Sequence, residues 1–160
     1  MTSTIEARLQ LQEDITEIIR LKARYCRAAD CGWDRPKPDS AGVADCFVAD
    51  GVWDAGPGFA RLTGTDAIRN YFATKEHPFG LHTVSNPIIH VDGDRATGQW
   101  QLLCPSIIEN DQHIWIGGIY DDEFLRTPNG WRFKTIQVTI AFTSKADPGF
   151  DVVKTFNPGS

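Results

Sequence analysis

The stretch HTVSNPIIHVDGDRATG, residues 82–98, decides the fold class, because the pattern of apolar residues changes here. Apolar side chains alternate with polar ones, which is typical of strands that bury one face. Asp92-Gly93 lies between two such runs and is a strong hairpin signal. The stretch therefore predicts two antiparallel strands joined by a tight turn.

Three strand-like runs continue this pattern to residue 142. They are rich in β-branched and aromatic residues, which favour strands. The turns between them are compact, and Asn129-Gly130 is a second hairpin signal. The runs are RATGQWQLLCPSII (95–108), HIWIGGIYDDEFL (113–125) and WRFKTIQVTIAF (131–142). We expect a meander of long antiparallel strands.

The chain before residue 81 has a helical pattern instead. With about 100° of rotation per residue, one stripe of the first helix is apolar and the opposite side is charged. Gly32 is a natural stop for this helix, and Pro36 and Pro38 forbid helix beyond it. The apolar stripe comprises Ile15, Ile18, Ile19, Cys26 and Ala29.

Shorter elements follow the first helix. We expect a second helix over 40–47, a first strand over 51–55 and a third helix over 65–75. Helices that come first and a strand meander that comes last predict an α+β fold. In such a fold the helices pack on one face of a curved sheet.

Length and composition indicate one globular domain and exclude several classes of function. The chain has 160 residues and a net charge of −5, so a basic face for nucleic acid is not expected. No apolar run approaches the roughly 20 residues needed to span a bilayer. The polar, acidic N-terminus is not typical of a signal peptide. We expect a cytoplasmic protein that contacts neither nucleic acid nor membrane.

Motifs for metals and cofactors are also missing from the sequence. The four cysteines form no C-x-x-C pair, and no histidines are spaced as a ligand pair. The glycines in GGIY and GPGF do not lie in a βαβ unit, so they are not dinucleotide loops. The cysteines are Cys26, Cys31, Cys46 and Cys104. We expect reduced, mostly buried thiols, no metal and no cofactor.

Four pieces of the sequence resemble the SnoaL-like group of the nuclear transport factor 2-like superfamily. They are IIRLKARYCRAAD, FVADGVWD, HTVSNPIIHVDGDRATG and GGIYDDEFLRTPNGWRF, within residues 10–143. The group includes bile-acid dehydratase, scytalone dehydratase and hexachlorocyclohexane dehydrochlorinase. The resemblance implies a cone-shaped half-barrel around a deep apolar pocket. We expect a domain over residues 1–143 and a tail over 144–160.

The resemblance also implies site residues and an assembly. In the dehydratase-like and dehydrochlorinase-like members, an aspartate that ends the first helix supports a histidine that starts a strand. Those positions match Asp30 and His82, and Tyr25 fits the helix tyrosine of bile-acid dehydratase. The additional basic residue of some relatives has no clear counterpart, because Arg126 lies beside a hairpin turn, where we expect it to be far from the pocket. The resemblance implies a homotrimer, with a homodimer as the second expectation.

An elimination reaction requires a base, which explains the pairing of a histidine with a carboxylate. A histidine supplies a base of near-neutral pKa, and a carboxylate on its other ring nitrogen fixes the tautomer. From the residues alone, an aspartate at the position of Asp30 more often ends a helix in solvent. A strand histidine such as His82 more often forms a hydrogen bond within the core. The resemblance favours the catalytic pair. Tyr25 either assists a leaving group or an oxyanion, or is an ordinary core tyrosine.

Other side chains are candidates for contacts with the substrate. Strand alternation places His82, Val84, Asn86 and Ile88 on one face, which makes Asn86 a candidate polar orienter. The many aromatic residues favour a cyclic, largely apolar ligand. We expect Lys22 to pack its stem in the apolar stripe and to reach water with its ammonium. The expected substrate-binding residues are Trp53, Phe59, Leu62, Phe72, Asn86 and Trp115.

We therefore interpret the chain as a cofactor-independent lyase, of dehydratase or dehydrohalogenase type, for a hydrophobic cyclic small molecule. Two alternatives stay open. One is an isomerase or polyketide cyclase that uses the same pocket and base. The other is a binding module without turnover. The tail over 144–160 either covers the pocket or a neighbouring subunit, or is a frayed terminus.

Overall fold

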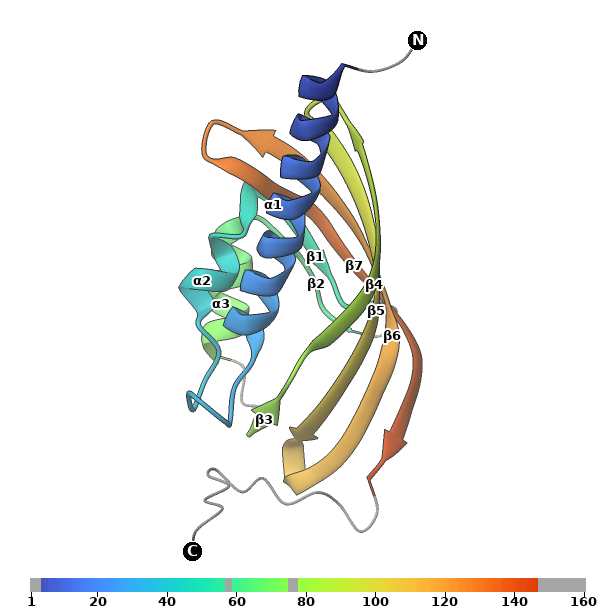
Figure 1. The fold of residues 1–160 in the computed structure, drawn as a ribbon. Coiled ribbons are helices and arrows are strands. Elements are labelled where there is room, and N and C mark those ends of the chain that lie inside the picture. Colours follow the sequence, from blue (N-terminus) through green and yellow to red (C-terminus); the bar gives the residue numbers. More distant parts are fainter. Residues whose placement is uncertain (1–3, 57–58, 75–77, 147–160) are drawn as a thin grey trace, which may run out of the picture.

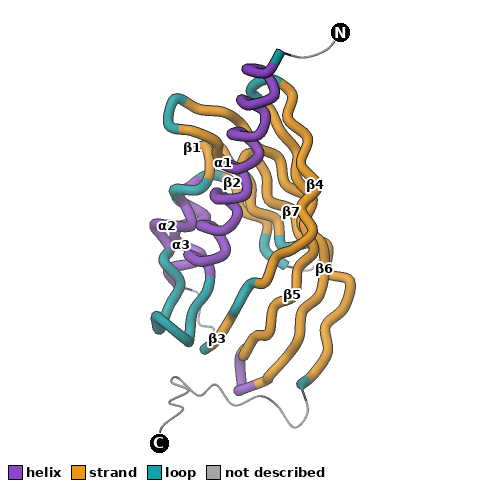
Figure 2. Tube along the Cα trace, in the orientation of Figure 1, coloured by secondary structure: helices purple, strands orange, loops and turns teal. Residues whose placement is uncertain are grey.

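A computed structural model describes residues 4–56, 59–74 and 78–146 of the chain. Helix α1 (Ile5–Ala29) lies across one face of a strongly curved sheet, and α2 (Ser40–Ala44) and α3 (Thr65–Thr74) lie beside it (Figure 1). Among the described elements, all three helices cover this same face, which leaves the other face of the sheet open (Figure 2). The predicted α+β half-barrel is confirmed.

Seven strands form one sheet in the order β2-β1-β7-β6-β5-β3, with β4 also paired to β5. β1 and β7 are parallel, and the other neighbours are antiparallel. β3 and β4 pair with different parts of β5, so Leu81 and His82 lie in the gap between them. The strands are β1 (Phe47–Asp54), β2 (Arg61–Thr63), β3 (Phe79–Gly80), β4 (Thr83–Asp92), β5 (Arg95–Ile108), β6 (Gln112–Thr127) and β7 (Gly130–Lys145).

The predicted strands of the meander agree with the observed ones, and β5 has the predicted bounds. The first strand is longer than predicted, because it begins at Phe47 rather than at residue 51. The second helix is correspondingly shorter and ends at Ala44. The side chain of Phe47 is buried in the core, so this residue joins the sheet instead of extending the helix.

Helix α1 buries the face that packs on the sheet. Ile18, Leu21, Tyr25 and Cys26 are buried on it, whereas Ile19 is largely exposed, which corrects the predicted stripe. The helix begins after Thr4, whose hydroxyl accepts a hydrogen bond from the N–H of Ala7. Each large apolar side chain buried in this way stabilises the fold by about 1.5–3 kcal/mol.

We expected the domain to end at residue 143, and β7 extends two residues beyond that point. β7 includes Ser144 and Lys145. Residues 147–160 lie outside the described part of the chain. The role of the tail therefore stays a prediction.

The N-terminal half of α1 is fixed to the sheet by a buried carboxylate. Arg126 of β6 donates two hydrogen bonds to Asp14, of 2.7 and 2.8 Å, and the indole N–H of Trp131 donates a third, of 3.2 Å. These bonds lower the pKa of Asp14 below its ordinary value, the bond from Arg126 most of all. Arg126 also pairs with Asp94. It is engaged in holding α1 to the hairpin turn.

We expect Asp14→Asn to lower the free energy of unfolding by about 2 kcal/mol at neutral pH, because hydrogen bonds to a charged group are lost. The pKa of Asp14 is lower in the folded state, so its contribution is present above pH 3.8 and disappears as the pH falls further. Urea unfolding at pH 7 and pH 3 measures both effects. Asp94→Asn, at an exposed partner of the same arginine, is the control and should change little. A loss in the free energy of unfolding of Asp14→Asn that is equal at pH 7 and pH 3 would contradict this role of Asp14.

Candidate active site

The end of α1 places a carboxylate in the interior. Asp30 is the residue that ends the helix, and its N–H still donates to the carbonyl of Cys26. Its backbone is extended, so the chain leaves the helix axis at this point. Cys31 then exchanges two backbone hydrogen bonds with Gly80, of 3.2 and 3.1 Å, which ties the helix end to β3. The Asp30 side chain is 5% exposed.

Gly32 allows this close approach. Its φ of +90° is in the left-handed region that favours glycine. A β-carbon at this position would collide with the backbone oxygen of Pro78. The glycine that we expected to stop the helix therefore also lets the next loop pass close to the start of β3.

His82 reaches Asp30 from the gap between β3 and β4. Its ring Nδ1 lies 2.8 Å from Asp30 Oδ1, and its backbone N–H donates to the same oxygen at 2.8 Å. Because His82 is outside the strands, its N–H is free to leave the β ladder and bond to the carboxylate. The structure therefore brings together the two residues that the sequence placed 52 positions apart.

The contact determines what the imidazole can do. A carboxylate beside Nδ1 holds the proton on that nitrogen, so the lone pair of the neutral ring is on Nε2. The His82 side chain is 18% exposed, whereas Asp30 is almost fully covered. The pair has the geometry of a base and the group that orients it. Its catalytic role stays a prediction.

Tyr25 lies one helical turn before Asp30 and is buried in the aromatic core. Its hydroxyl oxygen accepts a hydrogen bond from the indole N–H of Trp53 at 2.7 Å. Burial raises the pKa of Tyr25 far above its ordinary value. The phenol therefore keeps its proton and can donate a hydrogen bond, but formation of phenolate is strongly disfavoured.

Three of the expected substrate-binding residues belong to the same hydrophobic core as Tyr25. Trp53 and Phe72 are buried, with ring centroids 5.3 Å apart. Leu62 of β2 is the register partner of Trp53 and packs against the core. Of these three side chains, Trp53 contacts the hydroxyl of Tyr25, and Phe72 and Leu62 lie next to Trp53.

The other three lie elsewhere. Phe59 is 62% exposed. Asn86 is exposed and donates to the side chain of Gln101, and Trp115 is paired with Pro105 on the face away from α1. The register of β4 shifts between Ser85 and Ile88. After the shift, each residue of β4 is on the opposite face of the sheet from the one that strict alternation predicts. The structure does not bring Phe59, Asn86 or Trp115 to the Asp30–His82 pair.

The comparison with protein families covers the residues of this site. Residues 10–137 match the family model of the SnoaL-like domain, a range that includes Tyr25, Asp30 and His82. The match extends over most of the chain. The chain belongs to the SnoaL-like family. The resemblance inferred from the sequence is therefore confirmed.

This SnoaL-like chain matches curated proteins over a short stretch and solved structures over most of its length. An uncharacterised protein from Mycobacterium tuberculosis is 39% identical over 57 residues, which are 34% of this chain and 39% of that protein. The chain thus spans about two fifths of the length of the curated relatives that it matches.

Two solved structures illustrate the shared fold. A nuclear transport factor 2-like protein with a cystatin-like fold, from Novosphingobium aromaticivorans, has a TM-score of 0.71 and 26% identity over 86% of this chain and 88% of its own. A type-3 LinA hexachlorocyclohexane dehydrochlorinase from Novosphingobium barchaimii has a TM-score of 0.72 and 16% identity, over 92% and 99% of the two chains. At this identity the second likeness shows the fold alone.

A buried ion pair of this SnoaL-like protein was missed by sequence reasoning. Lys22 of α1 donates to Asp122 of β6 at 2.8 Å, and both side chains are fully buried. The ammonium lies 3.3 Å from the ring centroid of Tyr120 and 5.3 Å from that of Tyr25. The expectation that Lys22 reaches water is wrong.

Burial dominates the electrostatics of this pair. It lowers the pKa of Lys22, and it raises the pKa of Asp122 to about 6 although Lys22 opposes that shift. Within the described residues, Asp122 Oδ1 and the indole nitrogen of Trp100 are buried without a hydrogen-bond partner. A signal was available in YDDEF, because alternation places Asp122 on the same face as Tyr120 and Phe124, which are core residues.

The remaining findings concern the cysteines, possible metal ligands, helix lengths and surface grooves of the described residues. All four cysteines are buried, and none of them forms a disulfide. No three His, Cys, Asp or Glu side chains in the described ranges are arranged to hold a metal ion. Within the same ranges, no helix combines the length and apolar character needed to cross a membrane. Two surface grooves, of about 620 and 580 Å³, are lined by other residues than Asp30 and His82.

Proposed function

We propose that this protein is a cofactor-independent lyase that eliminates water or hydrogen halide from a hydrophobic cyclic small molecule. The observation that carries the proposal is the 2.8 Å contact between Asp30 and His82 Nδ1 at the end of α1. Membership of the SnoaL-like family supports a protein that processes small molecules. The likeness in fold to a dehydrochlorinase is consistent with the elimination class.

In the proposed step, His82 Nε2 removes a proton from a carbon next to an activating group. The electron pair of that C–H bond forms the new double bond, and the leaving group departs with the pair of its own bond. The imidazolium that forms is stabilised by the carboxylate of Asp30. The proton on Nε2 then passes to the departing hydroxide or to solvent.

Tyr25 is proposed to stabilise an oxyanion and not to give up its proton. Its phenolate is strongly disfavoured by burial, so a full proton transfer from Tyr25 would be slow. A hydrogen bond from the neutral phenol to a substrate oxygen has no such penalty. The indole of Trp53 already donates to Tyr25, which fixes the position of the hydroxyl oxygen. The aromatic surface of Trp53 and Phe72 favours a cyclic, apolar substrate.

The proposal is tested by incubating the protein with hydroxylated and halogenated cyclic compounds and measuring product mass. Loss of water or of hydrogen halide supports the lyase. A product of unchanged mass would instead indicate the isomerase or cyclase of the same fold. Ligand binding without any product would indicate the binding module, and His82→Gln should then leave the affinity intact.

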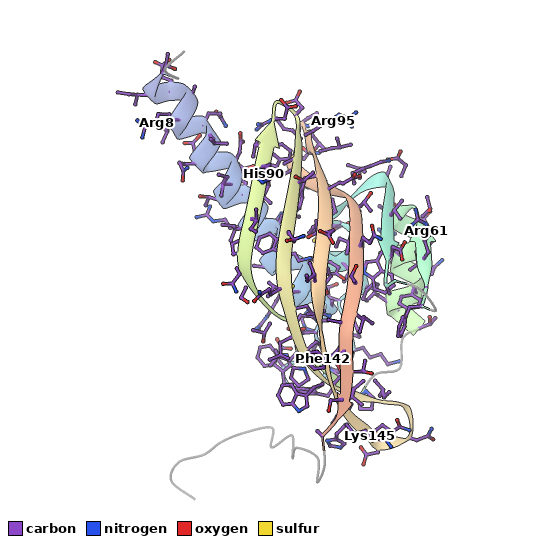
Figure 3. The ribbon with its side chains drawn as sticks, turned by 90° about the vertical axis from the view of Figure 1, so that its right-hand side faces the viewer. Arg8, Arg61, His90, Arg95, Phe142 and Lys145 are labelled. Atoms are coloured by element: carbon purple, nitrogen blue, oxygen red, sulfur yellow. The ribbon has the colours of Figure 1, made fainter. Side chains whose placement is uncertain are left out.

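We also propose a homo-oligomer, a trimer first and a dimer second, that uses the open face of the sheet. This face carries a group of exposed large apolar side chains, and Figure 3 shows Phe142 on it. Such a concentration of exposed apolar surface is typical of an interface. The exposed apolar residues of this face are Ile88, Leu103, Trp115, Ile119 and Phe142.

Light scattering coupled to size exclusion measures this assembly. We expect the mass of a trimer for the unchanged protein and a shift towards monomer for Phe142→Arg, because a charge on the apolar face opposes its burial. Leu9→Arg, at an exposed apolar residue of α1, is the matched control and should leave the mass unchanged. A monomer in the unchanged protein would refute the proposal.

A further inference from the structure

A groove of about 580 Å³ lies on the outer side of α1, away from the aromatic core. Its walls come from the last turns of α1, from α2 and from the β6–β7 turn. Its volume is in the range of small-molecule sites. The arginines that line it are Arg24, Arg27, Arg35 and Arg132. This concentration of positive charge is local, since the chain as a whole carries −5.

Two of the four guanidinium groups share one carboxylate, which balances a single positive charge. Asp34 lies 2.7 Å from Arg27 and 3.5 Å from Arg35. Arg27 also lies over the ring of Trp33, at 4.5 Å from the centroid. These two arginines therefore have structural partners that explain their positions.

The other two guanidinium groups are less closely paired, although the Glu17 carboxylate and the Arg132 guanidinium both approach Gly130. Within the described ranges, no carboxylate lies within 4.0 Å of Arg24 or Arg132. The Arg132 side chain donates to the carbonyl of Trp131 at 2.9 Å. The negative end of the α1 dipole would explain a cation at Arg24. It does not explain Arg132, which comes from β7.

Arg24 and Arg132 both line the groove, as does Cys46. Both guanidinium groups also lower the pKa of the Cys46 thiol, against the larger rise that burial causes. The backbone fixes this arrangement, because Phe133 N–H donates to the carbonyl of Cys46 at 2.9 Å. Arg132 is therefore held next to the segment that Arg24 faces from the helix.

Two carboxylates also line the groove and offset part of this charge. Asp39 accepts a hydrogen bond of 2.9 Å from Gly42 N–H as the cap of α2. Asp45 is 4.0 Å from Arg69, which is on α3 outside the groove. Among the lining residues four guanidinium groups face two carboxylates, so the groove carries an excess of positive charge.

We propose that this groove binds a small molecule that carries a phosphate or diphosphate group. Guanidinium groups bind phosphate oxygens through paired hydrogen bonds, and two of them from different elements suit an anion with two charged centres. Arg24 and Arg27 are on α1 beside Tyr25 and Cys26, so the site lies across the helix from the candidate active site. The inference does not rest on the proposed lyase activity.

Calorimetric titration with inorganic pyrophosphate at low ionic strength tests the proposal. We expect saturable binding to the unchanged protein, weakened about tenfold or more by Arg24→Gln and by Arg132→Gln. Arg132→Lys, which keeps the charge but loses the planar fork, should give an intermediate loss. Arg20→Gln is the matched control, because Arg20 is exposed on the same helix one turn earlier and does not line the groove.

Four outcomes would overturn the proposal. One is the absence of pyrophosphate binding by the unchanged protein when its melting curve shows an intact fold. Another is an equal loss in Arg20→Gln, which would indicate unspecific attraction of anions. The third is binding of citrate as tight as that of pyrophosphate, which would exclude a preference for phosphate. Binding of heparin without pyrophosphate binding would likewise refute a small-molecule site.

Discussion

Lys22→Met is expected to lower the free energy of unfolding by about 3–5 kcal/mol, because it leaves the buried carboxylate of Asp122 without its cation. The ammonium of Lys22 is 2.8 Å from Asp122 Oδ2, and both side chains are fully buried. Methionine fills a similar volume, so the loss reports the charge more than a cavity. Urea unfolding followed by tryptophan fluorescence measures it, with Trp100 and Trp131 in the core as probes.

The double variant Lys22→Met with Asp122→Leu separates the charge from the packing. It removes both buried charges, so we expect it to recover most of the stability that the single variant loses. Arg20→Met, at an exposed position of the same helix, controls for the change of residue type. A loss below about 1 kcal/mol in Lys22→Met would contradict a buried ion pair.

The pH dependence of the single variant is a second check. Lys22 is the main group that lowers the pKa of Asp122, so its removal leaves that pKa even higher than about 6 in the folded state. A carboxyl whose pKa is raised by folding contributes stability at low pH, and this contribution is lost as the pH rises through the folded pKa. Lys22→Met should therefore be destabilised less at pH 5 than at pH 8. The double variant should not show this difference.

The strands of the meander were predictable because their signals are local. Each turn signal, Asp92-Gly93 and Asn129-Gly130, lies within a few residues of the two strands that it joins. The register shift in β4 was not predictable in the same way. Asn86 has a φ of 52° before Pro87, and the strand changes face there, so that Val84 packs against the core while Ile88 is exposed. A strict period of two could not anticipate this bulge.

Some residues of the candidate site were predictable from the sequence and others were not. Asp30 and His82 were found because their types and places match the pattern of a family, although they are 52 residues apart. Lys22 was misread because its surroundings were inferred from its own helix alone. Its partner comes from a strand 100 residues later, and only a fold that places α1 over β6 brings them together. A charge in an apolar stripe is therefore a reason to look for an opposite charge on the inner face of a strand.

His82→Gln is expected to lower kcat for a substrate found in the mass screen by about 10²–10⁴-fold, because the base is removed while a side chain remains beside Asp30. Asp30→Asn should have an effect of comparable size. An amide donates to Nδ1, so the neutral ring would carry its proton on Nε2 and could no longer accept one there. His90→Gln is the matched control, because His90 is an exposed histidine of β4 on the open face of the sheet.

The combination of the two variants distinguishes a working pair from two separate structural residues. If Asp30 acts through His82, Asp30→Asn should cost little more in a protein that already carries His82→Gln, since effects within one catalytic unit are not additive. Two independent losses that multiply would contradict the pair. Unchanged kcat in His82→Gln would exclude it as the base and leave the hydrogen bonds of 2.8 Å between His82 and Asp30 as a clamp that ties the end of α1 to the start of β4.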